Sequence, residues 1–142
     1  MTAAQNGGPA APEAAAEVYQ AARQDKPWGH EVIFAAIEGK YVGKVIHVTA
    51  GHSISLQYHR QKEETISVLS GAGLVEFGPS ATALTGQHFG PGDTIHLPAG
   101  ALHRVTAITD LTFAEASTAE AGWREDVVRL EDKYGRTGTT AP

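Results

Sequence analysis

Residues 51–71, GHSISLQYHRQKEETISVLSG, contain the pattern that decides the fold. Between Ser53 and His59 apolar side chains occupy every second position, which is typical of a β-strand with one apolar and one polar face. Glycines flank the stretch and mark turns at both ends. This part of the chain is therefore expected to form a β-sheet.

The same kind of strand-forming sequence continues on both sides of this stretch. Short runs rich in Val, Ile, Tyr and Thr are separated by Gly, Pro and Asp at spacings of roughly eight to twelve residues. No segment between them offers the helix that a parallel crossover needs. We therefore expect an all-β, antiparallel sheet closed into a barrel or jelly roll. The expected strands are 31–37, 41–49, 53–59, 65–69, 73–77, 94–97, 102–107 and 111–117.

The ends of the chain differ in composition from its centre. Residues 13–24, EAAAEVYQAARQ, contain strong helix formers, so the N-terminal leader, 1–25, is expected to be either flexible or partly helical, with one short helix in this stretch. The sequence DKPWG at 25–29 interrupts any helix. We expect one domain over 26–136, followed by a tail, 137–142, since 142 residues suit a single core.

The composition excludes several classes of function. The net charge is −5, and no run of Lys or Arg is long enough to follow a phosphate backbone, so nucleic acid is not an expected partner. There is no cysteine, which excludes disulfides and thiolate metal sites. No apolar stretch approaches the roughly 20 residues that cross a bilayer, and residues 1–16 lack the basic and apolar regions of a secretory signal. We expect a cytoplasmic protein without a membrane partner.

Two stretches contain candidate metal ligands. His59 and Gln61 share one strand face, and Glu64 follows a short turn that can fold back towards them. In residues 92–103, GDTIHLPAGALH, His103 comes three residues after a Pro-x-Gly turn that fixes where the next strand begins. Imidazole and carboxylate together suit zinc, iron, manganese, cobalt or nickel. Spacing alone leaves ordinary packing or surface histidines as the other interpretation.

These stretches resemble the two cupin motifs, G-x(5 or more)-HxH-x(3,4)-E-x6-G and G-x5-PxG-x2-H-x3-N. Glu64 lies seven residues before Gly71, and Pro98, Gly100 and His103 keep the spacing of the second motif. The resemblance implies a cupin fold with a divalent metal held by His59, Glu64 and His103.

A longer resemblance covers most of residues 26–136. It consists of KPWG, SLQ-x-H, LPAGALHR and VVRLEDKYGR, which begin at positions 26, 55, 97 and 127. Together these segments resemble type II phosphomannose isomerase, a small cupin that often forms the C-terminal domain of a bifunctional mannose-1-phosphate guanylyltransferase. Only the isomerase-like part is expected here. The resemblance implies a metal-dependent conversion of mannose 6-phosphate to fructose 6-phosphate.

The sequence departs from the cupin pattern at two positions. Gln61 replaces the second histidine of HxH, and Ala107 replaces the asparagine that closes the second motif. An amide oxygen is a weaker ligand than imidazole for zinc or iron. Phosphomannose isomerases of the other type use a Gln-x-His metal pair, which Gln57 and His59 match. Either amide can therefore complete the site.

An aldose–ketose isomerisation moves a proton through an enediol, so it needs a base as well as a group that polarises the carbonyl. His96, where the family usually has Tyr, is the candidate base, although it can equally be a histidine packed on a strand; Glu64 suits the role of ligand better. Arg136, which closes the family's YGR signature, and Lys44 are candidates for binding phosphate. Arg104 is expected on the opposite face, in a surface ion pair.

Other interpretations remain open. A cupin can also be an iron dioxygenase or a lyase on a small organic substrate, and the changes at Gln61 and Ala107 favour a cupin that only binds a small ligand. The apolar face of the sheet needs a cover, for which a homodimer is expected. The acidic residues at 125, 126, 131 and 132 are expected to form a solvated face.

Overall fold

The computed structural model describes residues 12–142, and residues 1–11 of the expected leader lie outside the described part. The described chain contains eleven strands, and none of its residues is helical, so it has no helix that could cross a membrane. The strands are β1 (Ala22–Lys26), β2 (Gly29–Ile37), β3 (Tyr41–Val48), β4 (Leu56–Tyr58), β5 (Glu64–Ser70), β6 (Gly73–Phe77), β7 (Thr85–Phe89), β8 (Thr94–Leu97), β9 (His103–Ala107), β10 (Leu111–Thr118) and β11 (Val128–Glu131).

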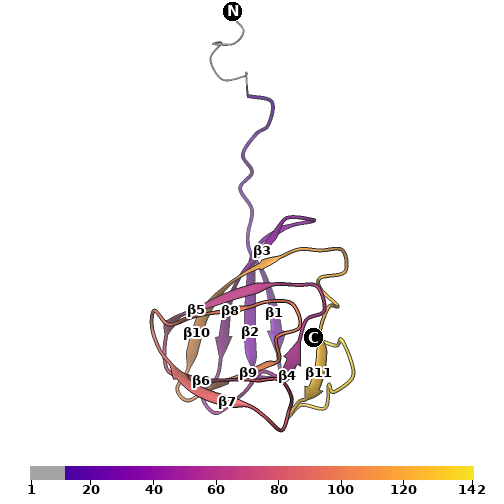
Figure 1. Ribbon diagram of the computed structural model, residues 1–142. Coiled ribbons are helices and arrows are strands. Elements are labelled where there is room, and N and C mark those ends of the chain that lie inside the picture. Colours follow the sequence, from indigo (N-terminus) through magenta and orange to yellow (C-terminus); the bar gives the residue numbers. More distant parts are fainter. Residues whose placement is uncertain (1–11) are drawn as a thin grey trace, which may run out of the picture.

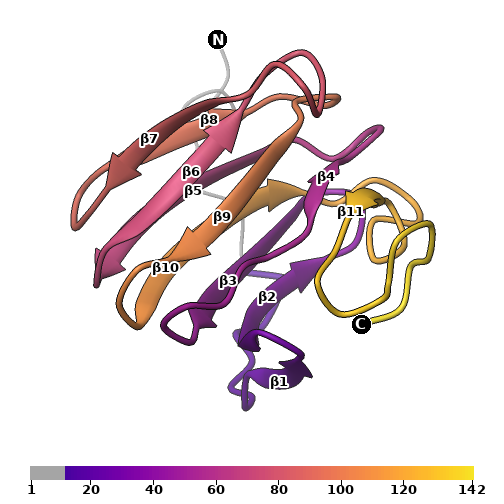
Figure 2. The same cartoon turned by 90° about the horizontal axis from the view of Figure 1, so that it is seen from below.

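The strands form two sheets that face each other (Figure 1 and Figure 2). One sheet has the order β1-β2-β3-β10-β5-β8 and the other the order β11-β4-β9-β6-β7. Every strand pairing among the described residues is antiparallel. This arrangement confirms the expected cupin jelly roll.

The hydrophobic core lies between the two sheets. In β10, Leu111 and Phe113 are buried while the residues between them are more exposed, as expected for a strand with one face towards the core. The same alternation turns Glu115 inward, where the apolar packing ends. One end of the sandwich is therefore filled by apolar side chains, and the other is open to polar ones.

Of the two forms expected for the leader, the short helix at residues 13–24 does not form. Residues 12–21 have no regular structure and are exposed along their whole length, so no packing supports a helix there. An isolated helix of about 12 residues is marginal in water. Residues Ala22–Lys26 instead pair with Gly29–Ile33 of β2, which satisfies their backbone groups.

Three strands, β1, β7 and β11, were not expected from the sequence. All three lie at edges of the two sheets. Edge strands have a solvent-facing side, so their sequences need not alternate clearly; β7, TGQHF, is mostly polar. The central strands agree with the expected ranges to within a few residues, apart from β4, which is shorter.

Candidate functional site

Three side chains from three different strand ends meet inside the sandwich. His59 follows β4, Glu64 begins β5 and His103 begins β9. The Nε2 atoms of His59 and His103 lie 3.5 Å and 3.3 Å from the same Glu64 Oε1. His59 is 7% exposed, and Glu64 and His103 are each 4% exposed. Their donor atoms all lie within 4.8 Å of one another, so the expected ligands converge.

The turns next to these strands fix the positions of the two histidines. Gly100 of the Pro-x-Gly turn adopts a φ of +86°, a conformation that favours glycine. Its N–H donates a hydrogen bond of 2.7 Å to the carbonyl of His59. The turn that starts the His103 strand is thereby tied to the chain that carries the other histidine.

The donor set fits a divalent metal. Bonds of about 2.0–2.2 Å to one ion place two ligand atoms roughly 3.0–3.6 Å apart, and the separations from Glu64 Oε1 agree with this. The Nδ1 of His59 contacts the carbonyl of Asp126, and the Nδ1 of His103 lies 2.9 Å from the carbonyl of Ala101. Such contacts leave Nε2 as the ligand atom. Among the described residues, the buried Nε2 of His59 has no hydrogen-bond partner.

The two candidate amides are in different environments. Gln57 is directly opposite His103 in the β4–β9 pairing and lines the cavity, and its Oε1 accepts a 2.7 Å hydrogen bond from Ser55. Gln61 lies on an exposed turn and does not line the cavity. The structure thus brings Gln57 to the three converging side chains and places Gln61 away from them.

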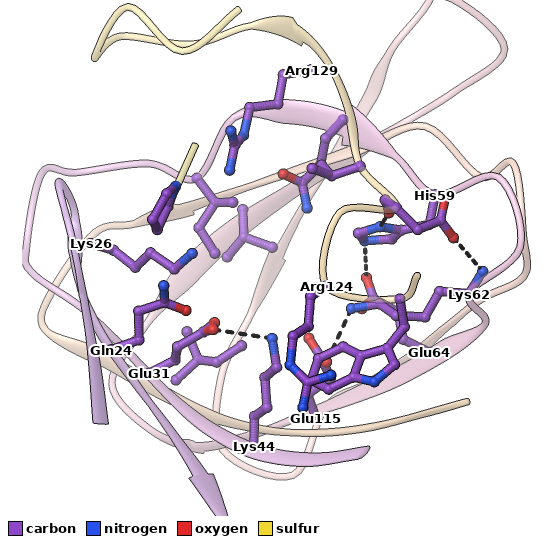
Figure 3. Close-up of a pocket in the computed structure, with 18 of the residues that line it drawn as sticks. Gln24, Lys26, Glu31, Lys44, His59, Lys62, Glu64, Glu115, Arg124 and Arg129 are labelled. Carbon is purple, nitrogen blue, oxygen red and sulfur yellow. Dashed lines mark hydrogen bonds and ion pairs between the residues drawn. The ribbon is translucent and has the colours of Figure 1, made fainter. Parts of the chain in front are cut away.

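The site opens into a cavity of about 430 Å³ (Figure 3). Lys44 and Arg136 line it, whereas His96 does not. The His96 side chain is 57% exposed and contacts Glu63, because its neighbour Leu97 points into the core. The structure therefore does not bring His96 to the candidate ligands.

Ala107 and Arg104, which were also singled out from the sequence, do not line the cavity. Ala107, at the position of the motif's asparagine, is 1% exposed and packs in the hydrophobic core. Arg104 pairs with Glu76 and Glu131 away from the cavity lining, which agrees with the expected ion pair on the opposite face.

Two buried charged residues beside the candidate ligands were not identified from the sequence. The Nζ of Lys62 lies 3.6 Å from Oε2 of Glu64 and 3.5 Å from Oε2 of Glu115. Both residues line the cavity, and Figure 3 shows them next to Glu64. The alternation of β10 with Leu111 and Phe113 could have identified Glu115, but Lys62 lies in a turn, where no periodic signal exists.

Asp126 holds the turn that carries Lys62. Its carboxylate accepts hydrogen bonds of 2.8–2.9 Å from the backbone N–H groups of Arg60, Gln61 and Lys62. Burial opposes the charge of Asp126, but these hydrogen bonds outweigh it and lower the pKa of the carboxyl below its ordinary value. The expectation of a solvated acidic face is therefore wrong for this residue. It is wrong for Asp132 too, since its side chain is 0% exposed and binds Arg136.

The electrostatics of the site favour an additional positive charge. Burial works against ionisation of Glu64, yet the adjacent imidazoles of His103 and His59 and the charge of Lys62 hold its pKa well below the ordinary value. Burial likewise opposes the charge of His103, but its hydrogen bond to Glu64 raises the pKa of the imidazole. The pKa of Glu115 is raised by burial and by the charge of Glu64.

Next to the candidate ligands, buried carboxylates outnumber buried ammonium groups. Glu64 and Glu115 share the single ammonium group of Lys62. A proton on His103 can balance the difference, and so can a metal cation at the same place. Metal binding would replace the proton, because a ligating imidazole must be neutral.

Comparison with known proteins connects this site to a family. The family model of the mannose-6-phosphate isomerase C-terminal region matches residues 13–132. The mannose-1-phosphate guanylyltransferase ManC of Salmonella typhimurium is 31% identical over 113 residues, which are 78% of this chain and 22% of ManC. The xanthan biosynthesis protein XanB of Xanthomonas campestris is 28% identical, over 88% of this chain and 28% of XanB. The chain thus spans about a quarter of the length of these curated relatives.

Solved structures share the fold at lower sequence identity. The capsular polysaccharide assembling protein CapF of Staphylococcus aureus has a TM-score of 0.66 and 18% identity, over 81% of this chain and 35% of CapF. The oxalate decarboxylase of Lactobacillus farciminis has a TM-score of 0.62 and 18% identity, over 78% of this chain and 33% of the enzyme. KdgF from Halomonas sp. has a TM-score of 0.59 and 19% identity, with coverage of 69% and 87%.

Proposed function

Because this chain belongs to the mannose-6-phosphate isomerase C-terminal family, we propose that it is a metal-dependent isomerase of sugar phosphates, with mannose 6-phosphate as substrate. The observation that carries the proposal is the convergence of His59, Glu64 and His103 at the wall of a cavity that is also lined by cationic side chains. A sugar phosphate needs both features, one at its carbonyl end and one at its phosphate end.

The proposed metal ligands are the Nε2 atoms of His59 and His103 and the Oε1 of Glu64, with the amide oxygen of Gln57 as the fourth donor. A divalent cation held there would act as a Lewis acid that stabilises negative charge on the substrate oxygen. The Nδ1 contacts of both histidines orient the rings, and the surrounding walls keep bulk water away.

Glu115 is our candidate for the base that moves the proton between the adjacent carbons. Its carboxyl is buried, lines the cavity, and has an Oε2 without a hydrogen-bond partner among the described residues. Lys62 lies within 3.5 Å of that oxygen and balances its charge. The solvent-exposed His96 has neither the burial nor the position for this role, so we assign it none in the reaction.

Cations at the cavity would bind the phosphate group. Lys44 lies 3.1 Å from Glu31, and Arg136 makes an ion pair of 2.9 Å with Asp132. Both cations are buried and line the cavity, and their carboxylate partners hold their side chains in place. A guanidinium that is fixed in this way loses little conformational freedom when it binds a phosphate.

The activity assay follows the conversion of mannose 6-phosphate to fructose 6-phosphate by the full chain. We expect turnover after loading with one of the candidate divalent metals, loss of turnover with a chelator, and recovery when the metal is returned. Unphosphorylated mannose is the matched control and should react far more slowly. Metal-containing protein that leaves mannose 6-phosphate unchanged would reject the proposal, and oxygen uptake with iron would point to a dioxygenase instead.

We also propose that the chain forms a homodimer through the outer face of the six-stranded sheet. Phe34 and Tyr41 are 48% and 54% exposed there, and the ring of Phe34 lies across Gly43, where an added Cβ would meet it at 2.6 Å. A second copy would cover these apolar groups. Sedimentation equilibrium should give twice the chain mass, and a Phe34→Glu variant should shift the chain to the monomer; a monomeric unchanged chain would contradict this proposal.

A further inference from the structure

Three cationic side chains gather in a part of the cavity lining away from the candidate metal ligands. Lys26 comes from β1, Arg129 from β11, and Arg136 from the segment after β11. Figure 3 shows Lys26 and Arg129 directing their charged groups into the cavity, on the other side of the drawn space from Glu64. Burial, and then the positive charges of Lys44, Arg129 and Arg136, lower the pKa of Lys26 despite the opposing effect of Glu31. Like charges are therefore held close together.

The positive charges of this cluster are only partly neutralised. Arg136 pairs through Nε and one terminal nitrogen with Asp132, at 2.9 Å each. Arg129 is 7% exposed, and within residues 12–142 it has no carboxylate at ion-pair distance and no partner for its buried Nε. The charge of Glu31 raises the pKa of Lys26, but the Glu31 carboxylate is hydrogen-bonded to Lys44. Buried donors without partners are costly, so these groups favour an anionic ligand.

Main-chain carbonyls of residues 137–142 occupy part of this donor set. One terminal nitrogen of Arg129 donates to the carbonyls of Thr139 and Ala141, at 3.1 Å and 2.7 Å. One terminal nitrogen of Arg136 donates to the main-chain oxygen of Pro142 at 3.1 Å. Thr140 and Pro142 line the same cavity. These six residues therefore form a strap over the cationic cluster.

We propose that Lys26, Arg129 and Arg136 form a phosphoryl-binding site, and that the strap, residues 137–142, covers it until a phosphate group displaces the carbonyls. The assignment of the ligand as a sugar phosphate rests on the proposed function; the site itself rests on the cations and the strap. Phosphoryl oxygens carry charge and form hydrogen bonds about twice as strong as those of neutral carbonyls such as Thr139 and Ala141, which Arg129 contacts. Phosphate therefore replaces the carbonyls at a net gain.

The site lies apart from the candidate metal ligands, so it can be tested without metal or turnover. Inorganic phosphate is titrated into chelator-treated full chain, with binding followed by calorimetry at fixed ionic strength. Arg129→Gln should weaken phosphate binding at least about tenfold, because it removes a charge-assisted donor pair. The matched control is Arg23→Gln, which makes the same charge change on β1 at a side chain that is 61% exposed and should bind phosphate normally.

Further variants keep the test decisive. Lys26→Gln probes the same site from another strand, so it replaces Arg129→Gln if that variant does not fold. A chain that stops after Thr137 should bind phosphate several-fold more tightly, since the competing carbonyls are gone. Absence of phosphate binding to the unchanged chain, or equal affinity of Arg129→Gln and Arg23→Gln, would refute the site. Unchanged or weaker binding by the shortened chain would refute the strap.

The outcomes also separate this inference from the proposed isomerase. Phosphate binding that depends on Arg129, in a chain that never converts mannose 6-phosphate, would retain the site and reject the isomerase. Conversion of mannose 6-phosphate with an unchanged KM in Arg129→Gln would retain the isomerase and reject the assignment of a sugar phosphate to this site.

Discussion

A His103→Ala variant is expected to bind divalent metal at least about 100-fold more weakly than the unchanged chain. It removes one of the three convergent donors, and loss even of an outer contact to a metal ligand costs about 10–100-fold in affinity. His103 Nε2 lies 3.3 Å from Glu64 Oε1, so alanine leaves an open gap in the donor set. Metal content after purification and competition with a chromophoric chelator measure the effect.

His96→Ala is the matched control for this prediction. His96 is the other histidine of the 92–103 segment, but its side chain is 57% exposed and contacts Glu63 away from the cavity. It should keep the metal affinity of the unchanged chain. Equal metal content in His103→Ala and His96→Ala would show that the convergence of His59, Glu64 and His103 is not a metal site.

Lys62→Met is expected to destabilise the metal-free protein by about 3–5 kcal/mol, the usual cost of leaving a buried charge without its partner. Lys62 is 5% exposed and is the ammonium group between Glu64 and Glu115. Burial opposes its charge, but the charges of Glu115, Glu64 and Glu31 raise the pKa of Lys62 above its ordinary value, so it is a cation in the folded state. Urea unfolding in the presence of a chelator measures the loss.

Two further variants identify the cause of that loss. Lys40→Met makes the same change at an exposed position and should shift the unfolding free energy by no more than about 0.5 kcal/mol. Adding Glu115→Gln to Lys62→Met removes the carboxylate that loses its ion-pair partner and should restore part of the stability. If the double variant is no more stable than Lys62→Met alone, the ion pair does not explain the effect.

The central strands and the three candidate ligands could be predicted because their signals are local. Alternation along β3, β5 and β10 follows from the two-residue repeat of any strand, and the Pro-x-Gly turn before His103 is set by neighbouring residues. The edge strands β1, β7 and β11 gave no such signal. The residues from 13 to 24 favoured a helix by propensity, but propensity is weak where no tertiary contact supports it.

The sequence by itself determined the all-β fold and the identity of His59, Glu64 and His103 as a group, since motif spacing and strand period act along the chain. Only the tertiary structure placed Gln57 and not Gln61 at the cavity, turned His96 outward, and placed Glu115 beside Glu64. The physical reason is that these relations depend on the order of strands in the sheets and on turn geometry. β1 and β11, which carry Lys26 and Arg129, lie in different sheets, and pairing of β1 with β2 and of β11 with β4 brings their side chains to one cavity.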